Sequence, residues 1–198
     1  MVFVSACLFL ALVVSAPLLA AYLPKVQEPF FALALLGQHG MAEDYFPNGS
    51  PDIHVGENVR WTIYVYNHMG KTEYISLRIK LLNSTTMPPN STSCTPSCVP
   101  VTYEVQRFVQ NNETWLYPFS WSVKKATFLG DYQSLDNLVI NGRDVRTNVL
   151  AKNGCNFRSV IELWIFDEQL NDFRFGWSYG QESRCVWNQV WFNITKTS

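Results

Sequence analysis

Along most of the chain, hydrophobic and polar residues alternate with a period of two, which is the period of a β-strand that buries one face. Two runs show the alternation most clearly, with apolar members at Val59, Trp61, Ile63 and Val65 and at Ile75, Leu77, Ile79 and Leu81. Between them, Asn67-His68-Met69-Gly70 has the composition of a turn. The pattern therefore predicts two neighbouring strands that form a half-buried hairpin.

Further segments have strand-like patterns and short, turn-rich connections. They cover residues 101–109, 113–121, 138–140, 145–150, 157–166, 172–179 and 185–195. Asn141-Gly142 and Asn153-Gly154 favour two-residue hairpin turns, because both central positions of such turns need a positive φ. Residues 167–171 form a longer hairpin loop, and no segment after residue 23 has the period of a long amphipathic helix. The sequence predicts an all-β domain, an antiparallel immunoglobulin-like β-sandwich.

The first 23 residues, MVFVSACLFLALVVSAPLLAAYL, contain no charged side chain. A helix of this length would cross a hydrocarbon core of about 30 Å. A secretory signal usually has a basic start and a small-x-small cleavage site, but here the start is uncharged and Leu18 is at the −3 position of the best site, after Ala20. We predict an uncleaved transmembrane anchor at 1–23, with a cleaved signal peptide as the alternative. A linker at 24–28 and the β-sandwich domain at 29–198 follow.

Four of the five cysteines lie beyond the apolar segment, at Cys94, Cys98, Cys155 and Cys185. An even number outside the membrane fits disulfides, with three possible pairings. Residues 83–100 are rich in Ser, Thr and Pro and predict an exposed loop, so a local Cys94–Cys98 bridge is the simplest pairing. Cys155–Cys185 would then staple neighbouring strands. A four-thiolate zinc site is the competing interpretation, although such sites usually show two CxxC-type motifs.

Five Asn-x-Ser/Thr sequences could accept N-linked glycans. They begin at Asn48, Asn83, Asn90, Asn112 and Asn193. Polar turns are rich in these residues in any case, but five acceptors together with paired cysteines favour the outside of the membrane. Lys25 argues for the opposite orientation, because positive charge usually stays on the cytoplasmic side. We expect a single-pass protein of the cell membrane with an extracytoplasmic C-terminal domain.

A further pattern lies within residues 30–81. Its elements are Leu36-Gly37, the segment Gly40 to Tyr45 (GMAEDY), Val55-Gly56-Glu57, Asn67-His68 and the strand that ends at Leu81. In this order they resemble the archaeal membrane-protein family catalogued as domain of unknown function 1616, in the short single-pass form found in ammonia-oxidising archaea. The resemblance covers roughly a quarter of the chain, and many members of that family have several membrane helices. It implies an archaeal surface domain and no activity, because none is established for the family.

Composition and histidine spacing exclude several classes of function. The chain is 47% hydrophobic and only 16% charged, and its net charge of −1 gives no general electrostatic attraction for nucleic acid. The three histidines, His39, His54 and His68, form no HxH pair of the kind that copper and zinc sites favour. We therefore expect neither a nucleic-acid partner nor a metal, and the histidines are expected to make hydrogen bonds in turns.

The carboxylates near the N-terminal side of the domain are the remaining candidates for chemistry. They are Glu43, Asp44, Asp52 and Glu57. Their spacing is not that of a calcium-binding loop, so we expect them to cap turns and to pair with Arg60 or Lys71. The sequence also contains no nucleophile elbow and no phosphate-binding glycine loop. We predict no enzyme activity and no cofactor.

Aromatic residues are predicted on both faces of the C-terminal strands. Trp164 and Phe166 lie opposite the apolar face of their strand, and Trp187 and Trp191 lie opposite the apolar face of the last strand. Phe173, Phe175, Trp177 and Tyr179 are expected to share one face of the strand between them. Since only one face of a sheet can enter the core, Trp164, Phe166, Trp187 and Trp191 predict an interface for a partner, a sugar or a membrane surface. The alternative is that loops of the same domain cover both faces.

The sequence thus favours a non-catalytic, membrane-anchored protein of the archaeal cell envelope. It would act by binding or scaffolding other membrane or envelope proteins, with the lipid bilayer contacted through residues 1–23. Two alternatives use the same features: an accessory subunit of a multi-subunit membrane enzyme complex, and an extracellular carbohydrate-binding module with exposed tryptophans that stack on glycans.

Overall fold

The computed structural model describes residues 28–195. The expected membrane helix at 1–23 lies outside these residues, as do positions 24–27 of the expected linker and the last three residues of the expected domain. Within residues 28–195 no helix is both long and apolar enough to cross a membrane.

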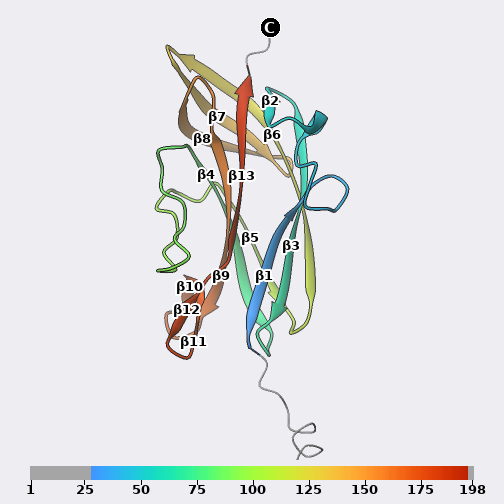
Figure 1. Ribbon diagram of the computed structural model, residues 1–198, viewed down its shortest axis with the longest axis vertical. Helices are drawn as coiled ribbons and strands as arrows, with labels where there is room; N and C mark the ends of the chain where they lie inside the picture. The colour runs from blue at the N-terminus through green and yellow to red at the C-terminus, as the bar shows by residue number, and fades with distance from the viewer. Residues whose placement is uncertain (1–27, 196–198) are drawn as a thin grey trace, which may run out of the picture.

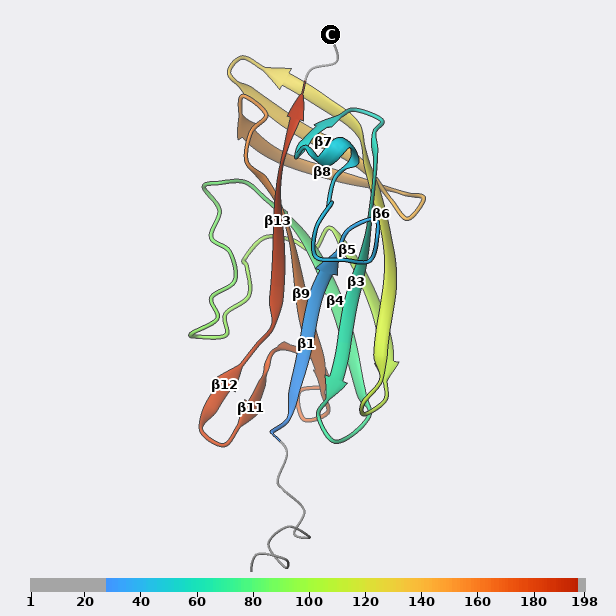
Figure 2. The ribbon, with the colours of Figure 1, turned by 45° about the vertical axis from the view of Figure 1, so that its right-hand side comes forward.

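Two β-sheets face each other as the layers of a sandwich (Figure 1, Figure 2), so the expected all-β sandwich is confirmed. The strands of the first sheet are, in order, β1 (Phe30–Leu36), β3 (Asn58–His68), β6 (Thr114–Leu129), β7 (Tyr132–Ile140) and β8 (Arg143–Lys152). Those of the second are β2 (Asp52–His54), β13 (Trp187–Thr195), β9 (Phe157–Asp167), β4 (Glu73–Leu82) and β5 (Tyr103–Val109), with β10 (Asp172–Phe175) also paired to β9. A 3-10 turn η1 (Pro47–Gly49) precedes β2, and β11 (Trp177–Tyr179) pairs only with β12 (Glu182–Arg184).

One pair of strands departs from the expected antiparallel arrangement. β2 runs parallel to β13, with Ile53 opposite Ile194, whereas every other strand pair among the described residues is antiparallel. A three-residue strand of this kind carries too little pattern to be recognised in the sequence.

The strands β3 and β4 bury the apolar positions that the alternation predicts, but they do not form the expected hairpin. β3 belongs to the first sheet and β4 to the second, so they face each other across the core. Asn67 holds the connection in place, because its buried side chain donates to the carbonyls of Lys71 and Val109 and accepts from the amide of Met69. Each strand has one apolar face. Two neighbouring strands of one sheet and two strands in opposite layers show this same pattern, so the sequence cannot distinguish the two arrangements.

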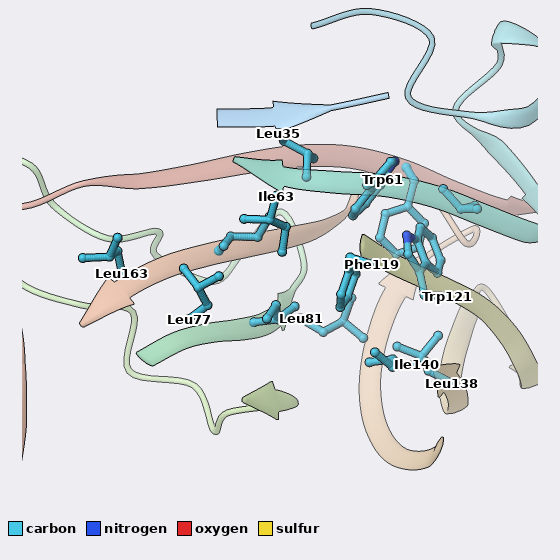
Figure 3. Close-up of a cluster of buried hydrophobic side chains, with 14 of the residues drawn as sticks. Leu35, Trp61, Ile63, Leu77, Leu81, Phe119, Trp121, Leu138, Ile140 and Leu163 are labelled. Carbon is cyan, nitrogen blue, oxygen red and sulfur yellow. The ribbon is translucent and has the colours of Figure 1, made fainter. Parts of the chain in front are cut away.

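The core between the sheets is rich in aromatic side chains (Figure 3). Trp61 packs with Phe119 at a ring separation of 5.9 Å and with Trp121 at 5.3 Å. Phe192 stacks on Phe157 at 5.6 Å and contacts Trp121 at 4.9 Å, which joins the first sheet to the second. Burial of such large rings is the main favourable contribution to folding.

Two strands are longer than their sequence pattern indicates. β6 extends to Leu129, and β7 begins at Tyr132. Bulges near Lys125 and between Leu135 and Asn137 shift the alternation by one residue, and this shift hides the additional strand residues from the sequence pattern. Asn141-Gly142 forms the expected hairpin turn, with φ of 45° and 78°. Asn153-Gly154 also turns with positive φ, but it carries the chain from the first sheet to the second and closes no hairpin.

The segment expected as one strand at 172–179 is two strands, β10 and β11. Gly176, at φ +86°, breaks the strand between them. Trp177 is consequently buried against Phe31 of the first sheet, at a ring separation of 5.9 Å. The expectation that Phe173, Phe175, Trp177 and Tyr179 share one face is therefore wrong.

Candidate functional site

The face of the second sheet that points away from the core, termed the outer face here, carries charged and aromatic side chains. Neighbouring strands contribute Ser76, Arg78 and Lys80 from β4, Arg158, Glu162, Trp164 and Phe166 from β9, and Trp187, Gln189 and Trp191 from β13. The register places Glu162 between Arg78 on β4 and Trp187 on β13. All four aromatic residues of the predicted interface lie on this face.

A buried ion pair occupies the middle of the outer face. Lys80 Nζ lies 2.9 Å from Glu162 Oε2, and the Glu162 side chain is fully buried. The indole Nε1 of Trp164 also donates to Glu162 Oε2 at 2.9 Å. Ser97 completes the site, because its amide donates to Glu162 Oε1 at 2.8 Å and its carbonyl accepts from Lys80 Nζ at 2.5 Å. Both charges therefore have partners, as burial of charged groups requires.

Ser97 belongs to the segment between β4 and β5, residues 83–102, which we call the covering loop. Figures 1 and 2 show it in green beside the second sheet. Arg158 donates to the carbonyl of Thr86 at 2.6 Å, and Trp187 Nε1 donates to Ser91 Oγ at 2.9 Å. The expected exposed loop is thus packed on the outer face, as the alternative interpretation of the aromatic pattern had it.

Cations of the same domain stack on the aromatic rings of the outer face. The Arg78 guanidinium lies 4.1 Å from the centre of the Trp164 ring, and that of Arg158 lies 4.5 Å from the centre of the Trp191 ring. Trp191, 40% exposed, is the only exposed tryptophan among residues 28–195. Most of the predicted interface is therefore engaged within the domain.

An open part of the surface lies where the domain begins. This end of the described domain carries the first residue of β1 and is drawn at the bottom in Figure 1, and we call it the lower end. A groove of about 870 Å³ is found there, and we call it the lower groove. Its wall contains Phe166 of the predicted interface, together with Tyr74 and Phe108. Phe108 stacks on Tyr74 at 4.4 Å and is nevertheless 65% exposed. Five charged side chains also line the groove: Lys71, Glu73, Asp167, Glu168 and Arg174.

Burial raises the pKa of Glu73 in the lower groove, although Lys71, with Nζ 3.4 Å from Glu73 Oε1, acts in the opposite direction. A raised pKa in the folded state means that this carboxyl destabilises the fold once it ionises. We expect Glu73→Gln to increase the free energy of unfolding more at pH 7 than at about pH 3.5, because the penalty appears as pH rises above 4.5. Urea denaturation at the two pH values measures the difference.

Glu104 on β5 is the matched control for Glu73, because its pKa is shifted in the opposite direction. Burial alone would raise its pKa, but hydrogen bonds from Ser76, Gln106 and Arg78 lower it. Its ionised form therefore stabilises the fold above pH 4.5, and Glu104→Gln should lose more stability at pH 7 than at low pH. Equal effects at both pH values for the Glu73 variant would contradict the assignment.

No protein-family model and no curated protein sequence matches the chain. Among solved structures, a β-glucosidase from Listeria innocua in complex with gluconolactone is similar, with a TM-score of 0.35 and 8% identity. The match covers 83% of this chain and 16% of the β-glucosidase, so the chain spans a small part of that enzyme's length.

The strand register separates the cysteines that were expected to pair. The amide of Ile194, at the far end of β13, donates to the carbonyl of Gly154 beside Cys155, whereas Cys185 precedes the start of β13. β13 has nine residues, which span roughly 30 Å. Because a disulfide needs Cα atoms within about 7 Å, the Cys155–Cys185 pairing is wrong. The Cys94–Cys98 pairing stays a prediction, with Cys94 partly buried and Cys98 exposed.

The histidines and carboxylates occupy turns and strand ends. His68 Nδ1 lies 2.6 Å from Asn112 Oδ1, and His54 Nδ1 lies 2.8 Å from Thr195 Oγ1. Glu57 accepts from the amide of His54, which is the expected capping role. Lys71 pairs with Glu73 rather than with the earlier carboxylates. Within residues 28–195, no three His, Cys, Asp or Glu side chains are grouped as metal ligands.

The five glycan acceptors differ in what their amides already bind. The Nδ2 of Asn193 donates to Asp52 Oδ1 at 2.8 Å, and the Nδ2 of Asn83 donates to the carbonyl of Leu150 at 2.8 Å. Asn48, Asn90 and Asn112 are exposed, and the Nδ2 of Asn48 donates to Glu57 Oε1 at 3.5 Å. In a glycosylating host we expect high occupancy at Asn90 and Asn112 and low occupancy at Asn83 and Asn193, measured by site-specific mass spectrometry. Equal occupancy at all five would mean that folding does not limit the modification.

Proposed function

We propose that this chain is a non-catalytic, membrane-anchored protein of the archaeal cell envelope that binds another membrane or envelope protein through its lower end. The carrying observation is the coincidence of three features at that end: the start of the described domain, the lower groove and a group of exposed apolar side chains. The resemblance over residues 30–81 supports the archaeal assignment, and the acceptor sequences and cysteines support an extracytoplasmic domain.

Chain length supports a position of the lower end close to the membrane. The uncharged segment ends at Leu23 and β1 begins at Phe30. The six residues between them can reach at most about 20 Å. If residues 1–23 span the bilayer, the lower end lies within that distance of its surface, where other membrane proteins present their extracytoplasmic parts.

The exposed side chains of the lower end suit a protein partner. Phe30, Phe108, Leu116 and Leu170 are all exposed and come from four different segments: β1, β5, β6 and the loop between β9 and β10. Aromatic and aliphatic groups beside charged ones are typical of the centre and rim of protein interfaces. The lower groove supplies the concave surface next to them.

The order of the strands supports the immunoglobulin-like assignment. β1-β3-β6 in one sheet and β13-β9-β4-β5 in the other correspond to the A-B-E and G-F-C-C′ order of such sandwiches. The hairpin of β7 and β8 is the departure, since it continues the first sheet beyond β6. Domains of this architecture commonly act as binding modules on cell surfaces.

Co-purification of the full-length chain from its native membrane tests the proposal. We expect membrane or envelope proteins in stoichiometric amount after extraction in mild detergent, identified by mass spectrometry. Phe108→Ala combined with Leu170→Ala should release them. Leu129 is also an exposed apolar residue but lies at the opposite end, so Leu129→Ala should retain them. Recovery of the chain alone, or equal recovery from both variants, would overturn the proposal.

The identity of the co-purified proteins distinguishes an envelope scaffold from an accessory subunit. The accessory-subunit alternative predicts that they are the subunits of one membrane enzyme. The carbohydrate-binding alternative has one specific observation in its favour, the exposed indole of Trp191. It predicts binding on a glycan array that Trp191→Ala abolishes. A silent array would exclude it.

A further inference from the structure

Two cysteines that are 91 positions apart in the sequence meet at the tip of the covering loop. The thiol of Cys94, in the loop, is within hydrogen-bonding reach of the thiol of Cys185, which lies between β12 and β13. Both sulfur atoms also contact the same group, the carbonyl oxygen of Ser91, at 3.7 Å for Cys94 and 3.9 Å for Cys185. The two sulfurs therefore share one small site.

Contacts that do not involve sulfur hold Cys94 in this place. Asn90 and Thr95 exchange both backbone hydrogen bonds, at 2.8 and 3.1 Å, and so close the turn that contains Cys94. The Asn90 side chain accepts from the amides of Thr92 and Ser93 within the same turn. Cys94 itself has a φ of 46°, in the left-handed region that non-glycine residues rarely adopt. The turn thus fixes the position of the Cys94 side chain.

Cys185 is held from the other side by the chain that precedes β13. A Cβ atom added at Gly176 would lie 2.2 Å from the Arg184 carbonyl and 2.9 Å from Cys185 Cβ, so only glycine permits this approach. Trp187, two residues after Cys185, donates to Ser91 Oγ and so ties the start of β13 to the turn that contains Cys94. Both cysteines are therefore positioned before any bond forms between them.

We propose that Cys94 and Cys185 form a disulfide that fastens the covering loop to the second sheet. The oxidant is the disulfide of an extracytoplasmic thiol–disulfide oxidoreductase. The Cys94 thiolate attacks that disulfide to give a mixed disulfide, and Cys185 then attacks Cys94 Sγ and releases the oxidant as a dithiol. Two electrons and two protons pass from the cysteine pair to the oxidant.

The bond has a clear structural consequence. The covering loop lies over the Lys80–Glu162 ion pair through Ser97, and its tip contacts Trp187. A cross-link at that tip keeps water from the ion pair by limiting the opening of the loop. Burial and the neighbouring Cys94 thiol raise the pKa of Cys185 to about 12, so the reduced Cys185 rests as a neutral thiol. The cross-link is independent of whichever partner the lower end binds.

Peptide mapping without reduction tests the pairing directly. The full-length chain is produced in an oxidising compartment, its free thiols are alkylated, and it is digested with trypsin. We expect a linked pair of peptides, residues 81–107 and 185–196, that separates on reduction. Because the first peptide also contains Cys98, the link must persist in Cys98→Ser and disappear in Cys94→Ser. A Cys94–Cys98 bond within the first peptide, or alkylation of both Cys94 and Cys185, would overturn the proposal.

Thermal unfolding gives a second readout that does not depend on any one variant folding well. Reduction of the wild-type protein should lower Tm on the order of 10 °C, as expected for a cross-link that closes a long loop in a domain of this size. Cys94→Ser, Cys185→Ser and the double variant should show the same loss, whereas Cys98→Ser and Cys155→Ser should show none. Additive losses in the double variant would contradict a shared bond.

Discussion

Replacement of Glu162 by glutamine is expected to reduce the free energy of unfolding by about 3–5 kcal/mol, because it leaves the Lys80 ammonium buried without a counter-charge. The Lys80 side chain is only 5% exposed and Glu162 Oε2 is 2.9 Å away. The other oxygen that accepts a hydrogen bond from the ammonium, within residues 28–195, is the Ser97 carbonyl, which is neutral. Urea denaturation monitored by tryptophan fluorescence would measure the loss.

Two further variants separate burial from charge. Lys124 and Asp144 form an even shorter pair, at 2.7 Å, but both side chains are more than half exposed, so Asp144→Asn should change stability by less than about 1 kcal/mol. The double variant Lys80→Met/Glu162→Gln removes both charges and retains an oxygen for the Ser97 amide. It should recover much of the lost free energy of unfolding, since removing both buried charges costs less stability than leaving one of them without its partner. A double variant as unstable as Glu162→Gln would show that the charges themselves are needed.

The alternation of residue types predicts which residues face the core but not which strands are neighbours. The buried positions of β3 and β4 follow from the sequence, whereas their placement in opposite sheets does not, because either arrangement buries the same residues. The bulges in β6 and β7 hide strand residues for a related reason: one extra residue inverts the alternation that identifies a strand.

The outer face shows a second limit of the sequence. The positions of Trp164 and Trp187 on a face away from the core are predictable from the period of two, but the chain that covers them is not. The covering loop binds mainly through its backbone, with the carbonyls of Thr86 and Ser97 and the amide of Ser97 as partners. Backbone groups are the same in every sequence, so these contacts cannot be predicted from the residue types of the loop.

The cysteines show that the strand register decides which disulfide pairings are possible, whereas the spacing of cysteines in the sequence leaves several open. A CxxxC motif suggests a local bridge, and two cysteines that flank strands suggest a staple between neighbours. Cys155 and Cys185 do flank neighbouring strands, β9 and β13, but at opposite ends of them. Only the register carries that information. The close approach of Cys94 to Cys185 depends likewise on the turn at residues 90–95.

Trp61→Ala should reduce the free energy of unfolding by about 3–5 kcal/mol and should also loosen the segment between β1 and β2. The Trp61 ring is buried among Phe46, Phe119 and Trp121, and its Nε1 donates to the carbonyl of Tyr45 at 2.6 Å. Alanine therefore leaves a large cavity and an acceptor without its donor. Urea denaturation measures the first effect, and faster amide hydrogen exchange over residues 37–50 measures the second.

Trp61→Phe distinguishes the two contributions, because phenylalanine fills most of the cavity but cannot donate to Tyr45. We expect it to lose roughly 1–3 kcal/mol from the unsatisfied carbonyl and the smaller ring, with faster exchange still confined to residues 37–50. Trp191→Ala is the control on the outer face: the residue is 40% exposed, so its loss should be smaller than that of Trp61→Ala, and hydrogen exchange over residues 37–50 should not change. If Trp61→Phe leaves exchange over residues 37–50 unchanged, the segment is held by the packing of Phe46 alone, and the hydrogen bond to Tyr45 contributes nothing to its order.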